Sequence, residues 1–208
     1  MKRGTFISVE GIDGAGKSTH VEFIRDYIKE HGKEVIITRE PGGTVLGEKI
    51  RELLLTSEHM HHNTELLLYF ASRQELIRQV IVPNLDAGVW VIADRFVDAS
   101  IAYQGGGREL GIDKIKQVYG LLEPHLTTDM TFLFDVPLEL ALDRLSRGRE
   151  LDRIELESRE FFERVQSSYH LLAKEEPERI KTVMTNQPVK YTRDFLTKYL
   201  DDLLKRSS

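Results

Sequence analysis

Residues 11–18 have the spacing of a phosphate-binding loop. They read Gly-Ile-Asp-Gly-Ala-Gly-Lys-Ser and match the pattern G-x-x-x-x-G-K-[ST]. In this pattern, glycines let successive backbone N–H groups turn inward around phosphate oxygens, and the N-terminus of the following helix adds positive partial charge. The pattern predicts that Lys17 contacts the β- and γ-phosphates of a nucleoside triphosphate and that Ser18 offers its hydroxyl to Mg²⁺. A glycine-rich helix cap formed by chance is the alternative, and the β-rich run before the segment disfavours it.

Two arginines stand at the ends of predicted strands. Arg39 closes the apolar run 35–39, and Arg95 directly follows the run 89–94. Ligands of open α/β sheets bind outside the carboxyl ends of the strands, so both arginines are expected near the phosphate-binding loop. A guanidinium group binds phosphate through two parallel hydrogen bonds, and the pair therefore predicts a second anion site. For either arginine alone, a surface salt bridge is an equally good interpretation.

Two aspartates also end hydrophobic runs. Asp94 has the position of a carboxylate that orders Mg²⁺ through water, although it could also cap the following helix. Asp135 ends the run 130–135 in the same way and is interpreted as structural.

The elements that must position these residues follow from the pattern of apolar side chains. Five short runs, at 5–10, 35–39, 89–94, 130–135 and 180–185, predict strands. Helical spacing of apolar residues separates them, for example at 17–31, 66–81 and 191–205. Strands that alternate with helices predict an α/β fold with a mainly parallel sheet covered on both faces. Without a linker-like shift in composition, residues 1–208 are expected to form one domain, in which 104–111 and 146–155 look like loops.

Composition limits the function further. The chain has 208 residues, 40% hydrophobic and 30% charged, with a net charge of −5 and no cysteine. The absence of cysteine excludes disulfides, thiolate metal sites and cysteine nucleophiles. An acidic chain disfavours a wide nucleic-acid footprint, and no apolar run approaches the ~18–20 residues of a membrane helix. Without an export signal, a cytoplasmic location is expected.

Other motifs indicate which class of phosphate-binding protein the sequence belongs to. A GTPase would need a base-reading N-K-x-D motif, which the sequence lacks. A small kinase remains, because the second anion site could hold a phosphorylated acceptor. A kinase with another nucleotide or nucleoside acceptor and, less favoured, a regulatory nucleotide-binding protein are the alternatives.

Several motifs together resemble the thymidylate kinase family. They are the segments 10–19, 38–44 (TREPGGT), 69–73, 94–107 (DRFVDASIAYQGGG), 147–155 and 185–188 (TNQP), in the order found in that family. The resemblance implies a P-loop nucleoside monophosphate kinase fold with strand order 2-3-1-4-5. It also implies a homodimer that phosphorylates dTMP to dTDP with ATP, for dTTP biosynthesis.

The resemblance also implies roles for individual residues. ATP would be bound by Gly11, Ile12, Asp13, Gly14, Ala15, Gly16, Lys17, Ser18 and Thr19, with adenine near Asn186, Gln187 and Pro188. Arg39 and Arg95 would hold the phosphate of dTMP, and Asp13 would approach the acceptor. Phe70 would stack on thymine, and Arg73 would bind its O4. The remaining pocket residues would be Ser100 and Gln104 at the edge of the base, Tyr103 beside the sugar C2′ and Pro41 near the thymine methyl group.

Arginines in the predicted lid form the last group. The position after Asp13 is Gly14, so the phosphate-binding loop lacks the basic residue that some family members have there. Arg147, Arg149 and Arg153 are expected to supply that charge from a lid, as in bacterial-type members. A solvated cluster neutralised by neighbouring acids is the alternative. The histidines of 59–62 are interpreted as a solvated connection and not as a metal site.

Overall fold

A five-stranded parallel sheet forms the centre of the structure, a computed structural model that describes residues 2–147 and 151–206. The strands lie in the order β2-β3-β1-β4-β5, and every neighbouring pair is parallel. Their bounds are β1 (Phe6–Glu10), β2 (Val35–Arg39), β3 (Trp90–Asp94), β4 (Met130–Asp135) and β5 (Ile180–Met184). The predicted fold and strand order are confirmed, although Thr5, Val89 and Thr185 lie just outside the strands.

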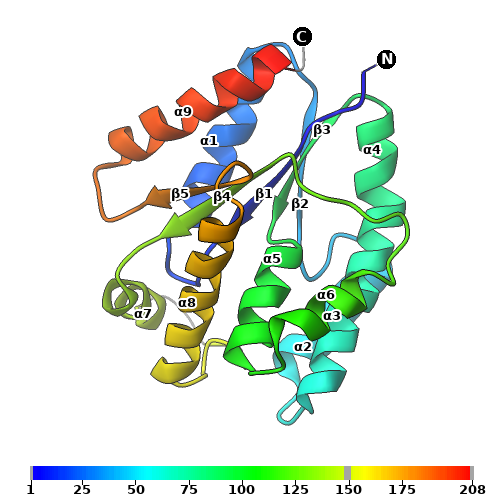
Figure 1. Ribbon diagram of the computed structural model, residues 1–208, viewed down its shortest axis with the longest axis vertical. Helices are drawn as coiled ribbons and strands as arrows, with labels where there is room; N and C mark the ends of the chain where they lie inside the picture. Colours follow the sequence, from blue (N-terminus) through cyan, green and yellow to red (C-terminus); the bar gives the residue numbers. More distant parts are fainter. Residues whose placement is uncertain (1, 148–150, 207–208) are drawn as a thin grey trace.

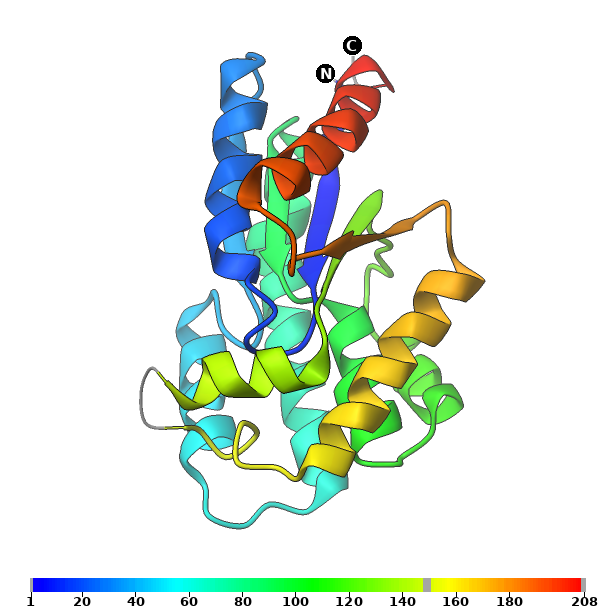
Figure 2. The same cartoon turned by 90° about the vertical axis from the view of Figure 1, so that its left-hand side faces the viewer.

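Helices connect the strands and cover both faces of the sheet (Figure 1). Figure 2 shows α1 and α8 on opposite sides of the strands, and α9 packs beside α1. The helical segments, with η for π-helical ones, are α1 (Lys17–Glu30), α2 (Val45–Thr56), α3 (His62–Leu76), η1 (Ile77–Ile81), α4 (Val82–Asp86), α5 (Val97–Ser100), η2 (Ile101–Gly107), α6 (Ile112–Tyr119), α7 (Leu138–Ser146), α8 (Arg159–Glu175) and α9 (Val189–Arg206). None of these described helices has the length and apolar composition that crossing a bilayer requires.

The three central strands supply the middle of the hydrophobic core. β1, β3 and β4 are buried along almost their whole length, because helices cover them on both sides. This double burial explains why their sequences are nearly continuous apolar runs without alternation. Large side chains such as Phe6, Trp90 and Phe132 fill the space between the sheet and the helices.

The carboxyl ends of the strands lie at one edge of the sheet, and the two ends of the chain lie at the other (Figure 1). At that second edge, Nζ of Lys2 donates a hydrogen bond to the backbone carbonyl oxygen of Arg206 at 2.7 Å. The segments after β1, β2 and β3, which carry most of the predicted site residues, therefore meet at the edge away from the chain ends.

The prediction of a loop at 104–111 is wrong for its first half. Residues 104–107 belong to η2, which packs against α8. A Cβ atom on Gly107 would lie 2.6 Å from Cε2 of Phe161, and one on Gly106 would collide with Oγ of Ser168. The glycines therefore allow α8 to pack directly on the backbone of η2. They are needed here for close packing of two helices and not for the backbone conformation of a turn.

The role of Phe132 in the core gives a test of this packing. Phe132 is 0% exposed on β4, whereas Leu121 is 78% exposed after α6. We expect Phe132→Ala to lower the free energy of unfolding by about 3–5 kcal/mol, because it leaves a cavity between sheet and helices. Leu121→Ala should change it by only about 0.5 kcal/mol or less. Denaturant unfolding of both variants measures the difference, and similar losses for the two would contradict the burial of Phe132.

Candidate active site

The phosphate-binding loop lies between β1 and α1. Gly14 and Gly16 have φ angles of 82° and 84°, in the left-handed region that residues with a Cβ rarely adopt. Lys17 is the first residue of α1, and its Nζ donates hydrogen bonds to the carbonyl oxygens of Gly11 at 2.9 Å and Ile12 at 3.0 Å. These bonds hold the ammonium group over the loop, at the place where a phosphate would bind.

Buried charges set the protonation of the lysine in this loop. Burial lowers the pKa of Lys17 to about 8, and the nearby Arg95 acts in the same direction. The carboxylate of Asp13, 3.9 Å from Nζ, opposes this effect. Lys17 is therefore mostly charged at neutral pH and loses its charge in mildly alkaline solution.

Asp13, Arg95 and Tyr103 form a hydrogen-bonded cluster next to Lys17. Nη2 of Arg95 donates to Oδ1 of Asp13 at 2.7 Å, and the Tyr103 hydroxyl donates to Oδ2 at 3.1 Å. Burial alone would raise the pKa of Asp13, but Arg95 and Lys17 hold it well below its ordinary value. Arg95 also has a positive φ of 73°, a conformation that is uncommon for residues with a side chain and recurs at functional sites.

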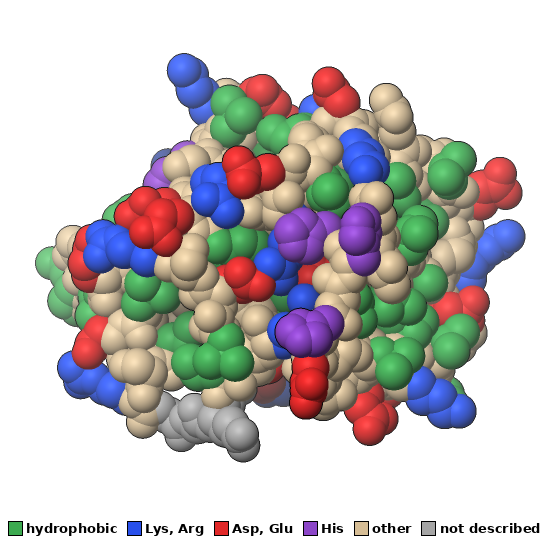
Figure 3. Space-filling model, turned by 90° about the horizontal axis from the view of Figure 1, so that it is seen from below, with side chains coloured by type: hydrophobic (Ala, Val, Ile, Leu, Met, Phe, Trp, Pro, Cys, Tyr) green, Lys and Arg blue, Asp and Glu red, His purple; other side chains and the backbone are tan. Residues whose placement is uncertain are grey.

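One pocket at the carboxyl edge of the sheet brings together most of the predicted site residues. Figure 3 looks onto this end of the molecule and shows basic and acidic side chains interleaved in a recessed region, beside histidine side chains. The predicted residues that line the pocket are Asp13, Lys17, Arg39, Pro41, Arg73, Asp94, Arg95, Ser100, Tyr103 and Gln104. Residues from strand ends far apart in sequence therefore face a single space.

Arg39 lines this pocket with a side chain that is largely exposed. Its Nη2 donates to Oε2 of Glu48 at 2.9 Å, and Oε1 of the same glutamate accepts from the backbone N–H of Gly43 at 2.8 Å. Both side chains of the ion pair are exposed, so the contact is weak and exchangeable. The guanidinium group can therefore turn from Glu48 to an anion in the pocket.

Arg73, by contrast, is buried and rigidly held where it lines the pocket. It is 1% exposed, and its Nε donates to Glu40 Oε2 at 2.8 Å. Its Nη2 donates to Ser100 Oγ at 2.9 Å and also reaches Glu40. The remaining nitrogen, Nη1, is buried and has no hydrogen-bond partner among the described residues. A buried donor without a partner is rare in folded proteins, and here it belongs to a side chain that lines a pocket.

Phe70 is buried in the hydrophobic core, against the side chain of Arg73. The described residues that line the pocket do not include it; it is 3% exposed in the hydrophobic core, with the Arg73 guanidinium 4.6 Å from its ring centroid. Tyr69, one residue earlier, lines the pocket instead. Arg73 lies four positions after Tyr69 and three positions after Phe70, and both spacings place side chains on one helix face. Helical spacing could therefore not choose between the two rings.

Asp94 fits the metal prediction better than the alternative of a helix cap. The next helix, α5, has Phe96 as its N-cap residue and no side-chain cap, so Asp94 does not cap it. Oδ1 of Asp94 is buried and has no hydrogen-bond partner among the described residues. Ser18 and Asp94 line a common cavity beside the phosphate-binding loop. Asp135, by contrast, is paired with His170 at 2.8 Å and with Gln166, in keeping with a structural role.

Of the predicted lid arginines, the two that the structure describes contact acidic side chains and not the phosphate-binding loop. Arg147 is exposed and pairs with Asp143, one helical turn earlier. Arg149 lies outside the described residues. Arg153 donates to Oε2 of Glu65 at 2.7 Å and to the carbonyl oxygen of Leu54 at 3.0 Å, and it is not among the pocket-lining residues. The prediction that Arg153 faces the phosphates therefore differs from the structure, because a buried carboxylate on α3 attracts it.

A further arginine, Arg144 on α7, contacts the phosphate-binding loop directly. Its Nη1 donates to the carbonyl oxygen of Gly14 at 3.2 Å, and its Nη2 approaches the carbonyl oxygen of Thr185 at 3.5 Å. The sequence motifs did not single out Arg144, because this residue precedes the predicted lid at 146–155. The signal available was its place at the start of the arginine-rich stretch that continues into that lid.

The histidine-rich connection between α2 and α3 lies at the surface. His59 and His61 are exposed, and Nδ1 of His61 accepts a hydrogen bond from the backbone N–H of Asn63 at the start of α3. The described residues contain no group of three or more His, Asp or Glu side chains arranged to hold a metal ion.

Comparison with known proteins agrees with this arrangement. The family model described as thymidylate kinase matches residues 9–196. The thymidylate kinase of Bordetella pertussis is 48% identical over 206 residues, covering 99% of each chain. That of Methylobacillus flagellatus is 49% identical over 191 residues, covering 92% of this chain and 94% of the relative.

A solved structure supports the same assignment. The crystal structure of thymidylate kinase from Ehrlichia chaffeensis superposes with a TM-score of 0.78 at 32% identity, covering 96% of this chain and 99% of that chain. Together with the sheet order and the phosphate-binding loop, these matches show that the chain belongs to the thymidylate kinase family.

Proposed function

We propose that the pocket at the carboxyl ends of β1, β2 and β3 is where this enzyme transfers the γ-phosphoryl group of ATP to the 5′-phosphate of dTMP. The enzyme makes dTDP in this way, for dTTP biosynthesis. The observation that carries the proposed location is that Lys17 of the phosphate-binding loop and the Asp13–Arg95 pair line one pocket. A kinase with a different acceptor would need a different base-binding end, whereas this pocket ends in the fixed arginine Arg73.

The reaction requires positioning more than proton transfer. A phosphate oxygen of dTMP is already a competent nucleophile near neutral pH, so no general base is needed. The protein must align two anions that repel one another and stabilise the charge of the group in transit. Arg39 and Arg95 would hold the acceptor phosphate, while Lys17 would stabilise the transferred group. Asp13 would keep Arg95 oriented and approach the acceptor.

The triphosphate would lie along the loop after β1, with its oxygens bound by backbone N–H groups and side chains of residues 11–19. Arg144 supports this placement, because it adds positive charge beside Gly14. Thr185 ties the segment after β5 to the loop, since its Oγ1 donates to the carbonyl oxygen of Ala15 at 2.7 Å. Adenine would therefore fit near Asn186, Gln187 and Pro188.

Ser18 and Asp94 are the residues that would hold Mg²⁺. Hydroxyl and carboxylate oxygens are ligands that suit this ion, and the buried Oδ1 of Asp94 has no other described partner. Bound there with ATP, Mg²⁺ would neutralise charge on the β- and γ-phosphates.

The base would lie at the end of the pocket formed by α3 and the start of η2. Nη1 of Arg73 would donate to O4 of thymine, and Ser100 and Gln104 would complete the edge of the base. Tyr69 would replace Phe70 as the ring that stacks on thymine. Pro41 would lie near the methyl group of the base, and Tyr103 would limit the space beside C2′ of the sugar.

The segment 146–155 would act as a lid that excludes water during transfer. Asp152, Ile154 and Glu155 already line the pocket from this segment. Arg147 would leave its exposed contact with Asp143 to reach the phosphates, together with Arg149. Arg153 would hold the lid to α3 through Glu65.

We expect the enzyme to be a single-domain chain that forms a homodimer and acts in the cytoplasm. Support for the dimer comes from large apolar side chains that are exposed on two helices that pack together, Val45, Leu46 and Leu53 on α2 and Leu67 on α3. Exposed apolar patches often mark protein interfaces. Release of ADP, measured across a panel of nucleoside monophosphates with the purified protein, tests the function; fastest turnover with an acceptor other than dTMP would contradict it.

Removal of the lysine in the phosphate-binding loop tests the proposed transfer site. We expect Lys17→Ala to lower kcat by at least about a hundredfold, because the charge acts on the transferred group. Thermal unfolding should stay close to that of the unaltered protein. A folded variant that retains normal turnover would contradict the role of Lys17.

The lowered pKa of Lys17 also predicts a pH dependence. The charged form prevails below about pH 8 and is lost as the pH rises through that value, so affinity for ATP should weaken between pH 7 and 9. Titration calorimetry at constant ionic strength measures Kd at each pH. In Lys17→Arg the charge does not titrate in this range, so its affinity should stay level. An equal decline in that variant would assign the effect to another group.

A matched pair of variants tests which ring stacks on the base. Tyr69→Leu should raise KM for dTMP by about tenfold, since base–aromatic stacking contributes roughly 1–3 kcal/mol. KM for ATP should not change. Phe70→Leu should lower the free energy of unfolding by roughly 1 kcal/mol and leave KM for dTMP nearly unchanged. A raised KM for dTMP in Phe70→Leu, together with an unchanged KM in Tyr69→Leu, would show that Phe70 is the ring that stacks on the base.

A further inference from the structure

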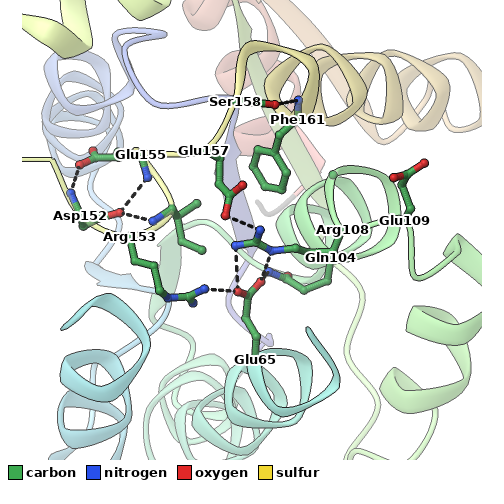
Figure 4. Close-up of polar contacts among 12 residues, drawn as sticks. Glu65, Gln104, Arg108, Glu109, Asp152, Arg153, Glu155, Glu157, Ser158 and Phe161 are labelled. Carbon is green, nitrogen blue, oxygen red and sulfur yellow. Dashed lines mark hydrogen bonds and ion pairs between the residues drawn. The ribbon is translucent and has the colours of Figure 1, made fainter. Parts of the chain in front are cut away.

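Glu65 on α3 is a wholly buried carboxylate at the centre of a polar cluster (Figure 4). It accepts hydrogen bonds from Nε2 of Gln104 at 2.9 Å, from Nε and Nη2 of Arg108 at 3.2 and 3.1 Å, and from Nη1 of Arg153 at 2.7 Å. Gln104 belongs to η2, Arg108 directly follows it, and Arg153 belongs to the segment between α7 and α8. One carboxylate therefore joins three parts of the chain around the pocket.

The surroundings of Glu65 keep it ionised. Burial alone would raise its pKa, but the hydrogen bonds from Arg108 and Gln104 hold the pKa below its ordinary value. An ionised carboxylate offers acceptors only. Arg108 and Arg153 contact it from two directions, and Arg108 is itself held by an ion pair with Glu157. The oxygen that faces Gln104 is thus fixed in position as well as in charge.

This fixed acceptor determines how the amide of Gln104 is turned. A glutamine amide has donors on its nitrogen and acceptors on its oxygen, so only Nε2 can face the carboxylate. Gln104 is 1% exposed and lines the pocket, and no described residue donates a hydrogen bond to its Oε1. The oxygen is therefore left as an acceptor for a ligand.

Arg73, which lines the same pocket, offers a hydrogen-bond donor where Gln104 offers an acceptor. Arg73 can only donate, and its buried Nη1 has no partner among the described residues. Ser100, which accepts from Arg73, is one helical turn before Gln104, so the two side chains share a face of the α5–η2 helix. A donor and an acceptor are thus presented side by side to the edge of the base.

This pair of groups matches one class of pyrimidine. Thymine carries the acceptor O4 next to the donor N3–H, whereas cytosine carries the donor N4–H₂ next to the acceptor N3. We propose that Glu65 is a positioning residue that fixes the amide of Gln104 with its oxygen toward the base, and so selects a pyrimidine with an N3–H group and rejects cytosine. The inference rests on the proposed placement of the base beside Arg73 and Gln104.

The test compares kcat/KM for dTMP with kcat/KM for dCMP in the full-length enzyme. Glu65→Gln keeps the shape of the side chain but adds a donor, so either end of the Gln104 amide can face it. We expect the preference for dTMP to fall by roughly tenfold or more, the usual effect of one buried hydrogen bond. Gln104→Ala should reduce the preference similarly, and combining both changes should cause no further loss. KM for ATP should stay unchanged throughout.

A matched control removes a carboxylate from the same cluster without contacting Gln104. Glu157→Gln breaks only the outer contact of Arg108, so its preference for dTMP should equal that of the unaltered enzyme. If Glu65→Gln does not fold, Glu65→Asp takes its place, because it keeps the charge for both arginines but draws the carboxylate back from Gln104.

The outcomes separate this inference from the proposed function. If Gln104→Ala reduces the preference for dTMP but changes at Glu65 do not, the positioning role of Glu65 is wrong and the base-binding site stands. If Gln104→Ala leaves the preference unchanged, both the positioning role and the placement of the base are wrong. An equal loss in Glu157→Gln would mean that any disturbance of the cluster lowers the preference, and the specific role of the contact between Glu65 and Gln104 would be wrong.

Discussion

The ion pair between Asp13 and Arg95 is the contact on which the rest of the site depends. Asp13 lies in the loop after β1, and Arg95 follows β3, the strand that pairs with β1 in the sheet. A single charge buried in this pocket would cost several kcal/mol of hydration free energy, which the pairing offsets. Because the parallel register of two central strands sets this distance, the proposed triphosphate and acceptor sites lie next to each other.

Carboxylates hold the other cations of the pocket in the same way. Glu40 fixes Arg73 and Glu48 holds Arg39, so these two arginines are already paired with carboxylates in the structure. The two pairs differ in strength, because the first is buried and the second is exposed. In the proposed function, the buried pair would give a rigid surface for recognising the base, whereas the exposed pair would open to admit a phosphate.

Local patterns in the sequence predicted an α/β fold with a mainly parallel sheet, whereas the strand order and the base-binding residues of the pocket were implied by the resemblance to the thymidylate kinase family. The phosphate-binding loop and the strand-end residues Arg39, Asp94 and Arg95 depend on short-range spacing and on the rule that ligands bind at the carboxyl ends of strands. Tyr69 could not be told from Phe70, because a helix turns about 100° per residue and both rings lie within one turn of Arg73. Arg153 could not be placed because its partner Glu65 is 88 positions away along the chain. Contacts of this range follow from the packing of elements and not from any local pattern.

The hydrogen bond from Lys2 to the carbonyl oxygen of Arg206 has a consequence for engineering. It brings the first and last described residues together at the edge of the sheet opposite the pocket. Adjacent termini on the surface are the condition under which circular permutation succeeds. A short flexible linker could therefore join these residues without crossing the substrate pocket, and new termini could be opened in the exposed turn after α6. A fluorescent reporter fused to the new termini would then lie at the turn after α6. In the rearranged sequence it would be far from the junction that joins Lys2 and Arg206.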